Sequence, residues 1–312
     1  MWIMSITMEF FQFLIIIFLS PLVTGVIKKL KAYMQGRVGP NVLQTYYDLL
    51  RLFKKDMVVS TVTSWIFKAT PYVVFAATVA AAMIVPVIST MPAGGMMGDV
   101  IALIYLFALA RFFMALAGLD AGTAFGGEGS SREMTVAILV EPMMMLALFT
   151  AAIAAGSTNI GRIAGGEGAT YSPSHLLALS AFIVAIIAET GRVPVDNPDT
   201  HLELTMIHEG MILEYSGKYL ALMEWAHSMK QMILFTLAAD IFLPLGMMHP
   251  AGGAGFLTAI GAYALKMSGM ALLMAAVEST RAKVRFFQLP SILGGAFVLA
   301  FLSLVTHIMM GK

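Results

Sequence analysis

The sequence of 312 residues contains no cysteine and little charge. Without thiols the chain forms no disulfides, and it cannot itself ligate iron–sulfur clusters or thiolate-bound metals. Charged residues make up 12% of the chain and hydrophobic residues 59%, whereas a soluble domain carries about 25% charged residues. The net charge of +1 predicts no polyanionic partner and therefore no nucleic acid. Apolar runs recur from end to end, so we expect a single integral membrane domain over residues 1–312.

Eight apolar segments are candidates to cross a bilayer, which takes about 20 residues of helix. They are residues 9–27, 70–91, 99–119, 133–156, 175–190, 219–247, 255–278 and 289–310. The first begins at Glu9 without a basic region or a small-residue cleavage site, so we interpret it as a retained helix. The predicted fold class is all-α, a polytopic transmembrane helix bundle. No clean internal repeat is visible, which disfavours an inverted-repeat transporter.

The placement of lysine and arginine predicts the orientation. If the N-terminus faces outward, fourteen of these residues lie in the inner loops, and only Arg162 and Lys312 lie in the outer loops and tail. With an odd number of spans, some of these basic loops would lie on the outer side, and the charge difference between the two sides would be lost. We therefore expect a multi-pass protein of the cytoplasmic membrane with both termini on the outer side and partners docked on the inner face.

An amphipathic helix is expected in the first inner loop, residues 28–68. Its apolar positions share one side and its polar positions the other, which indicates a helix in the membrane interface or, alternatively, a short soluble helix packed under the bundle. The apolar positions are Val42, Tyr46, Leu49, Leu50, Phe53 and Met57, and the polar ones are Gln44, Asp48, Arg51 and Lys55.

The other two inner loops are residues 118–131 and 191–217. The first is rich in glycine but lacks the strand–loop–helix context of a phosphate site. In the second, Asp196-Asn197-Pro198 marks a turn, and Thr200 and Glu203 have capping-box spacing. A helix carrying four ionisable residues should follow: Glu203, His208, Glu209 and Glu214.

Ionisable residues inside or at the ends of the apolar segments are the main functional signal, because such groups cost several kcal/mol in a bilayer and mark ion pathways. They are Arg111, Glu133, Glu141, Glu189, Glu224, Lys230, Asp240, Lys266 and Glu278. Glu224, His227 and Gln231 form a polar stripe. A file of protonatable groups with water between them would serve proton transfer.

Simpler interpretations apply to some of these charges. Beside Arg281, Lys283 and Arg285, Glu278 is expected to be a helix-end charge at the interface. Asp99 should be a favourable N-terminal charge, and Arg111 could pair with a single carboxylate. The spacing of His201 and His208 fits no metal signature, so we expect no metal site.

Two inner loops resemble a known family, that of the quinone-site membrane subunit of NADH–quinone oxidoreductase. The first motif is Arg37-Val38-Gly39-Pro40-Asn41 with Asp48, Leu49, Lys54 and Asp56 after it. The second is Glu189-Thr190-Gly191-Arg192-Val193-Pro194-Val195-Asp196 with Glu203 and Glu214-Tyr215-Ser216-Gly217 after it. The resemblance covers nearly the whole chain.

Within this family three stretches resemble the branch found in membrane-bound group 4 nickel–iron hydrogenases, including formate hydrogenlyase and hydrogenase-4. They are Arg111-Phe112-Phe113, Gly118 to Glu133, and Val140-Glu141-Pro142 with Ala155 to Ile160.

The resemblance implies an anchor subunit without redox centres of its own. The nickel–iron centre and the iron–sulfur clusters would lie on the hydrogenase large and small subunits, and antiporter-like membrane subunits would lie alongside. It implies a docking and coupling surface of Arg37, Arg192, Asp196, Asp199 and Glu203, to which we add Asp48. It implies that Glu133, Glu141, Glu214 and Glu224 begin a lateral proton pathway. From the charges themselves we add Glu209, Lys230, Asp240 and Lys266 to this pathway.

The leading hypothesis is a non-catalytic subunit that couples hydrogenase turnover to H⁺ or Na⁺ translocation. Three alternatives stay open at this point. The chain could be the quinone-site subunit of a respiratory NADH–quinone oxidoreductase, a stand-alone ion transporter, or a purely structural anchor.

Overall fold

The computed structural model describes residues 2–89, 98–166, 172–196, 206–244, 246 and 255–310, with side chains from residue 8 onward. Within these ranges the chain is helical and forms no strand. The helices are α1 (Trp2–Met34), α2 (Gln44–Lys54), α3 (Trp65–Ile84), α4 (Val100–Asp120), α5 (Ala124–Ala154), α6 (Ile160–Ala164), α7 (Pro173–Glu189), α8 (His208–Ile212), α9 (Gly217–Phe242), α10 (Phe256–Thr280) and α11 (Leu289–Met310), with a 3₁₀ turn, η2 (Phe286–Gln288), before the last.

All eight expected spans coincide with helices. Six described helices are long and apolar enough to cross a membrane, namely α1, α3, α4, α5, α10 and α11 with its preceding 3₁₀ turn. The other two are α7, which is apolar but shorter, and α9, which has 26 residues and more charge. The polytopic helical fold predicted from the sequence is therefore confirmed.

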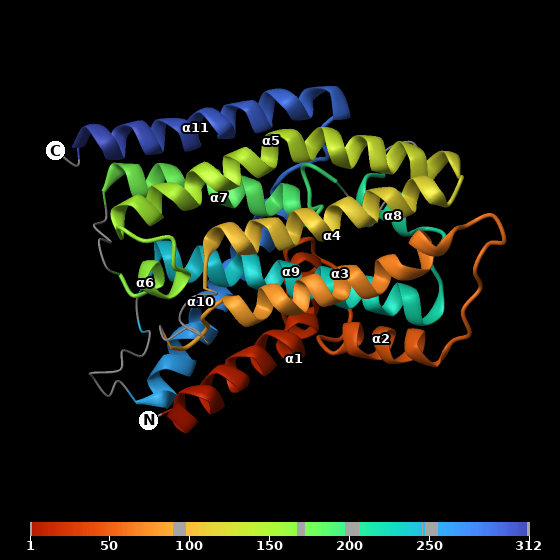
Figure 1. Ribbon diagram of the computed structural model, residues 1–312, viewed down its shortest axis with the longest axis horizontal. Helices are drawn as coiled ribbons and strands as arrows, with labels where there is room; N and C mark the ends of the chain where they lie inside the picture. Colours follow the sequence, from red (N-terminus) through yellow and green to blue (C-terminus); the bar gives the residue numbers. More distant parts are fainter. Residues whose placement is uncertain are drawn as a thin grey trace.

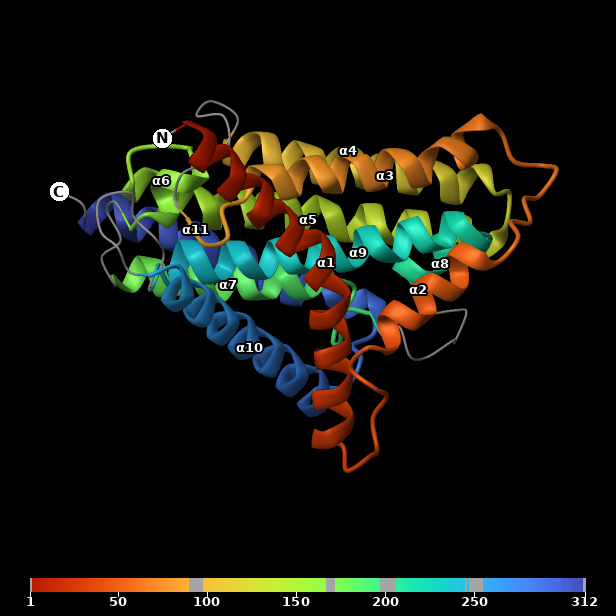
Figure 2. The same ribbon diagram turned by 90° about the horizontal axis from the view of Figure 1, so that it is seen from below.

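The long helices α3, α4, α5, α7, α9 and α11 run side by side, whereas α1 and α10 cross the bundle at a steep tilt (Figures 1 and 2). The start of α1 and the end of α11 lie at the same end of the bundle, as an even number of crossings requires (Figure 1). The short helices α2 and α8 lie toward the opposite end, which we call the inner end.

Small residues let the central helices approach closely. On α7, Ala178, Ala181 and Ala185 are fully buried at intervals of three and four residues, which places them on one face. Membrane helices pack through such small side chains because van der Waals contact, rather than the hydrophobic effect, drives their association. The helix α9 is buried from Gln231 to Phe242, so it forms the core of the bundle.

Short polar side chains begin several helices, as helix capping requires. Ser64 caps α3, Thr123 caps α5, and Asp99 caps α4 by accepting a hydrogen bond from the backbone N–H of Ile101. The interpretation of Asp99 as a favourable N-terminal charge is confirmed.

The glycine-rich segment predicted as an inner loop is mostly helix, so that prediction is wrong. Residues from Ala124 onward belong to α5, and only three residues separate it from α4. Gly129 serves close packing instead, because a Cβ there would lie 2.9 Å from the carbonyl oxygen of Ile207, beside α8. Sequence composition alone does not distinguish a flexible loop from such a contact.

The helix expected in the third inner loop is shorter than predicted. Its described part, α8, contains His208 and Glu209, but Glu214 lies in the turn that follows. The turn is fixed by Tyr215, whose ring stacks on Phe67 at 4.0 Å and whose hydroxyl donates to the Phe67 carbonyl at 2.8 Å. Burial raises the pKa of Tyr215, which keeps this donor protonated. Glu203 and Asp199 lie outside the described residues, as do Thr200 and His201.

The amphipathic helix in the first inner loop is confirmed as α2. Leu49 is buried, the Phe53 ring meets Trp225 of α9 edge-on at 6.2 Å, and the Tyr46 hydroxyl donates to the Phe18 carbonyl of α1. Leu50, expected on the same side, is 59% exposed. The helix therefore packs along α9 and α1 with one edge and leaves another apolar edge open.

Candidate functional site: a buried ion network

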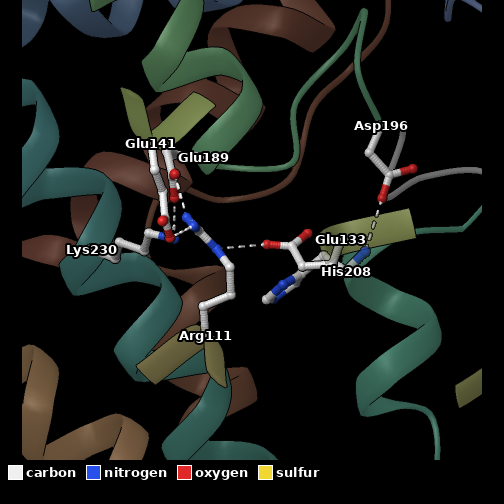
Figure 3. A network of polar contacts seen from close by, with 7 residues as sticks. All are labelled: Arg111, Glu133, Glu141, Glu189, Asp196, His208 and Lys230. Carbon is white, nitrogen blue, oxygen red and sulfur yellow. Dashed lines mark hydrogen bonds and ion pairs between the residues drawn. The ribbon is translucent and has the colours of Figure 1, made fainter. Parts of the chain in front are cut away.

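Arg111 of α4 lies at the centre of a buried group of charges. Its guanidinium contacts three carboxylates, Glu133 through Nε at 3.3 Å and Glu141 and Glu189 through its two terminal nitrogens. Glu133 and Glu141 come from α5 and Glu189 from the last turn of α7. Figure 3 shows the three carboxylates around the guanidinium. The expectation that Arg111 pairs with a single carboxylate is wrong.

Lys230 of α9 completes the group. Its ammonium lies 2.6 Å from the second carboxylate oxygen of Glu189 and 5.7 Å from the centre of the Phe107 ring. The central ion cluster is therefore Arg111, Glu133, Glu141, Glu189 and Lys230, and it joins four helices (Figure 3).

The central ion cluster contains two cations and three carboxylates. Buried charges cost several kcal/mol each, and mutual attraction offsets this cost only when partners and geometry match. Glu189 is almost fully buried between both cations, with a side chain 1% exposed. Glu141 has the most exposed side chain of the cluster, at 34%. One of the three carboxylates therefore reaches the surface of α5.

Two small cavities adjoin the cluster on its inner side. One, of about 10 Å³, is lined by Glu133, Glu189, Asp196 and His208 among others. The second, of about 30 Å³, is lined by Arg111, Glu133, Lys230, His208 and His227 with apolar neighbours. A cavity holds a water molecule from roughly 10–15 Å³ upward when polar groups line it. Both therefore have the size and the lining to hold water.

A second buried group, the Arg192 cluster, lies beside the first. Arg192 contacts Glu278 at 2.8 Å and the side-chain oxygen of Gln231 at 2.9 Å, and Lys31 contacts Glu278 at 3.1 Å. Glu278 has a side chain only 2% exposed. Its interpretation as a helix-end charge at the interface is wrong, because its partners come from α1 and the α7 turn rather than from the basic residues that follow it.

Asp196 holds the third inner loop together. One of its oxygens contacts Lys283 at 2.8 Å, and the other accepts the backbone N–H groups of Ile207 and His208 at 3.1 and 3.3 Å. Asp196 and Arg192 are both buried. They support the loop from beneath rather than forming its outer surface.

A third, separate pair lies farther along α9. Asp240 contacts Lys266 of α10 at 2.9 Å, and the second oxygen of Asp240 has no hydrogen-bond partner among the described residues. Ten residues of helix separate Asp240 from Lys230, which corresponds to about 15 Å. Within the described part of the chain, the Asp240–Lys266 pair therefore stands apart from the central ion cluster.

The structure brings together some of the residues predicted as a pathway and not others. Glu133, Glu141 and Lys230 belong to the central ion cluster, and Asp240 pairs with Lys266. Glu224 makes no ion pair with a described residue, Glu214 is exposed and Glu209 is half-buried on α8. Of the predicted docking residues, Arg37 is exposed and Asp48 accepts a hydrogen bond from Gln44 within α2 at 2.9 Å.

Two members of the central ion cluster, Arg111 and Glu189, are not among the pathway residues predicted from the sequence. Glu189 is the more informative of the two. It stands at the end of an apolar segment, where a charge is easily interpreted as a boundary. Its contacts with two cations from other helices make it the most enclosed carboxylate of the group. The signal available in the sequence is its position three residues before Arg192, which places both side chains at one helix end.

A helical bundle with this many buried charges belongs to the class of multi-pass membrane proteins whose intramembrane ionisable groups mark ion pathways. The chain belongs to the NADH dehydrogenase family, whose model matches residues 7–310. It is 35% identical to formate hydrogenlyase subunit 4 of Escherichia coli over 97% of this chain and 99% of that protein. It is 39% identical to hydrogenase-4 component C of the same organism over 94% and 93%.

Lower similarity extends to other members. A subunit of the NADH-quinone oxidoreductase of Paraburkholderia xenovorans is 28% identical over 75% of this chain and 70% of its own length. The fold matches a chain of the archaeal membrane-bound sulfane sulfur reductase, a respiratory membrane complex, with a TM-score of 0.83, 19% identity and 97% and 99% coverage. The family resemblance in the sequence motifs is confirmed, and the chain is a membrane subunit of an energy-converting complex.

Proposed function

We propose that this chain anchors a nickel–iron hydrogenase arm to the membrane and carries protons between that arm and a neighbouring membrane subunit. The observation that carries the proposal is the central ion cluster, with one carboxylate more than it has cations. A purely structural network would be expected to balance its charges, because an unmatched buried charge is destabilising. An additional carboxylate that reaches the surface is suited to bind and release a proton.

The geometry suggests an entrance and an exit. The two cavities connect the third inner loop, at Asp196 and His208, to Glu133 in the cluster. Glu141 lies on the outside of α5 next to Ile138, which is 71% exposed. An apolar helix face that contains one partly exposed carboxylate fits contact with another membrane protein, and we assign that position to an antiporter-like subunit.

The hydrogenase small and large subunits would dock on the inner end, where the basic loops lie. Arg37 and the open edge of α2 are available for direct contact. Arg192 and Asp196 would act from beneath by holding the third inner loop in place. The nickel–iron centre and the iron–sulfur clusters would belong to the docked subunits, and both termini of this chain would face outward. The Asp240–Lys266 pair would serve a later step near the outer side.

The decisive experiment replaces Glu141 by Gln in the intact complex, reconstituted or in membrane vesicles. This change keeps the shape and removes the charge. We expect H₂ turnover to continue with an uncoupling agent present, while the number of ions moved per H₂ falls by about tenfold or more. Glu9→Gln is the matched control, because Glu9 lies on α1 without an ion pair to a described residue. An unchanged ratio in Glu141→Gln would remove Glu141 from the path.

A second candidate function is the quinone-site subunit of a respiratory complex. It is favoured by the similarity to NADH-quinone oxidoreductase subunits. Purification of the tagged chain with its partners separates the two candidates. Nickel, a co-purifying hydrogenase large subunit and H₂ evolution from a reduced dye support the hydrogenase role. A nickel-free complex with inhibitor-sensitive quinone reduction supports the alternative.

A further inference from the structure

His208 occupies the junction between the two cavities beside the central ion cluster. Among the described residues, only Glu133 and His208 line both cavities. The smaller cavity adds Asp196 and Glu189, and the larger adds Arg111, Lys230 and His227. In Figure 3 the backbone of His208 points to Asp196, and its imidazole extends past Glu133. These two side chains therefore stand between the smaller cavity and the larger one.

A second imidazole faces the same space. The rings of His208 on α8 and His227 on α9 lie 4.6 Å apart at an angle of 37°. Neither ring makes a hydrogen bond to another described residue, since the contact of His208 with Asp196 comes from its backbone N–H. The ring nitrogens are therefore available to water in the cavities.

Imidazole is suited to such a position because one ring nitrogen accepts a proton while the other donates one. Glutamate and water on either side provide partners for both steps. Asp196 already fixes the start of α8 through the backbone, so the imidazole of His208 is not needed to hold the loop in place. Among the described residues, the ring of His208 contacts the ring of His227.

We propose that His208, with His227 beside it, relays protons between the Asp196 side and the central ion cluster. A proton binds one ring nitrogen of His208 from the smaller cavity, and the other nitrogen releases its proton to Glu133 or to water in the larger cavity. The ring is then neutral again as the other tautomer, and a flip of the ring exchanges the positions of its two nitrogens for the next proton. This inference rests on the proposed function, because it names the group through which the proton path enters the cluster.

The test uses the intact complex in vesicles and measures ions moved per H₂. His208→Ala should lower this ratio by about tenfold or more, and added imidazole should restore it, because the truncated side chain leaves room for the free ring. His208→Gln keeps polar atoms of similar reach but cannot carry a proton, so it should be as impaired as His208→Ala. The co-purification of partner subunits is measured for each variant to establish that the complex is intact.

Two results would overturn the relay. One is an unchanged ratio in His208→Ala, and the other is a normal ratio in His208→Gln, which would make His208 a spacer. Glu141→Gln is measured in parallel. If Glu141→Gln lowers the ratio and His208→Ala does not, the path exists and bypasses His208. If neither lowers it, the proposed function itself fails.

Discussion

Replacing Arg111 by Gln tests the central ion cluster most directly. The change removes the cation that three carboxylates share and keeps a polar, shorter side chain. Because Arg111 and Glu189 have side chains only 5% and 1% exposed, only water in the small adjoining cavity can take the place of the lost cation. We therefore expect a loss of stability far above that of a surface substitution.

The size of the loss follows from the contacts that remain. Removing one partner of a buried ion pair costs about 3–5 kcal/mol, because the other charge stays buried without compensation. Lys230 still faces Glu189, which limits the cost, and Glu141 is partly exposed. Glu133 loses its ion-pair partner. We expect about 4 kcal/mol for Arg111→Gln.

The double variant Arg111→Gln/Glu189→Gln provides an internal check. It removes one charge of each sign from a pair in direct contact, and it also takes away the carboxylate that Lys230 contacts. The two losses should therefore not add, and the interaction energy should be about 2 kcal/mol. Simple addition of the two single-variant losses would mean that Arg111 and Glu189 contribute to stability independently.

The assay is unfolding of the full purified chain in mixed micelles, followed by the fluorescence of its three tryptophans. Arg37→Gln is the control, because Arg37 is exposed on the first inner loop, and it should change the free energy of unfolding by less than about 0.5 kcal/mol. If Arg111→Gln unfolds with the same midpoint as this control, the buried-cluster reasoning is refuted.

Three further predictions use the same assay. Glu278→Gln should destabilise the chain by about 3 kcal/mol, because its buried carboxylate contacts two cations. Glu128→Gln is the control at an exposed pair and should cost less than about 1 kcal/mol. Equal losses of stability in the two variants would contradict the burial argument. Gly129→Ala should cost about 1–3 kcal/mol, because its Cβ would meet α8, and Gly127→Ala, with open space around it, should stabilise by up to about 1 kcal/mol. Tyr215→Phe removes one buried hydrogen bond and should cost about 1 kcal/mol; no loss would mean that stacking alone holds the turn.

The helices could be predicted from the sequence because each depends on a local run of apolar residues. The same holds for α2, whose apolar periodicity lies within one short segment, and for Asp99, whose partner is two residues away. The start of α5 could not be predicted, because Gly129 of that segment packs against the backbone at the start of α8, about eighty residues later in the chain.

The pairing of buried charges could not be predicted for a related reason. Arg111 and Glu189 are 78 residues apart, and Arg192 and Glu278 are 86 apart. Neighbours in sequence are a poor guide to Glu278, since the nearby basic residues are not its partners. The ionisable residues themselves are visible as charges in apolar segments, so the sequence indicates which residues form the network but not how they are connected.

The two buried clusters are better understood as one electrostatic unit. Both contain buried cations in contact with carboxylates: Arg111 and Lys230 in the central ion cluster, and Arg192 and Lys31, which contact Glu278, in the Arg192 cluster. Glu189 and Arg192 are three residues apart at the end of α7, and Lys230 and Gln231 are consecutive on α9. The charges of the two clusters therefore lie close together, so a change at one alters the electrostatic field at the other. Under the proposed function, movement of the third inner loop, which contains Arg192, would alter the field at the central ion cluster. Such a link would connect events at the inner surface to proton movement within the membrane.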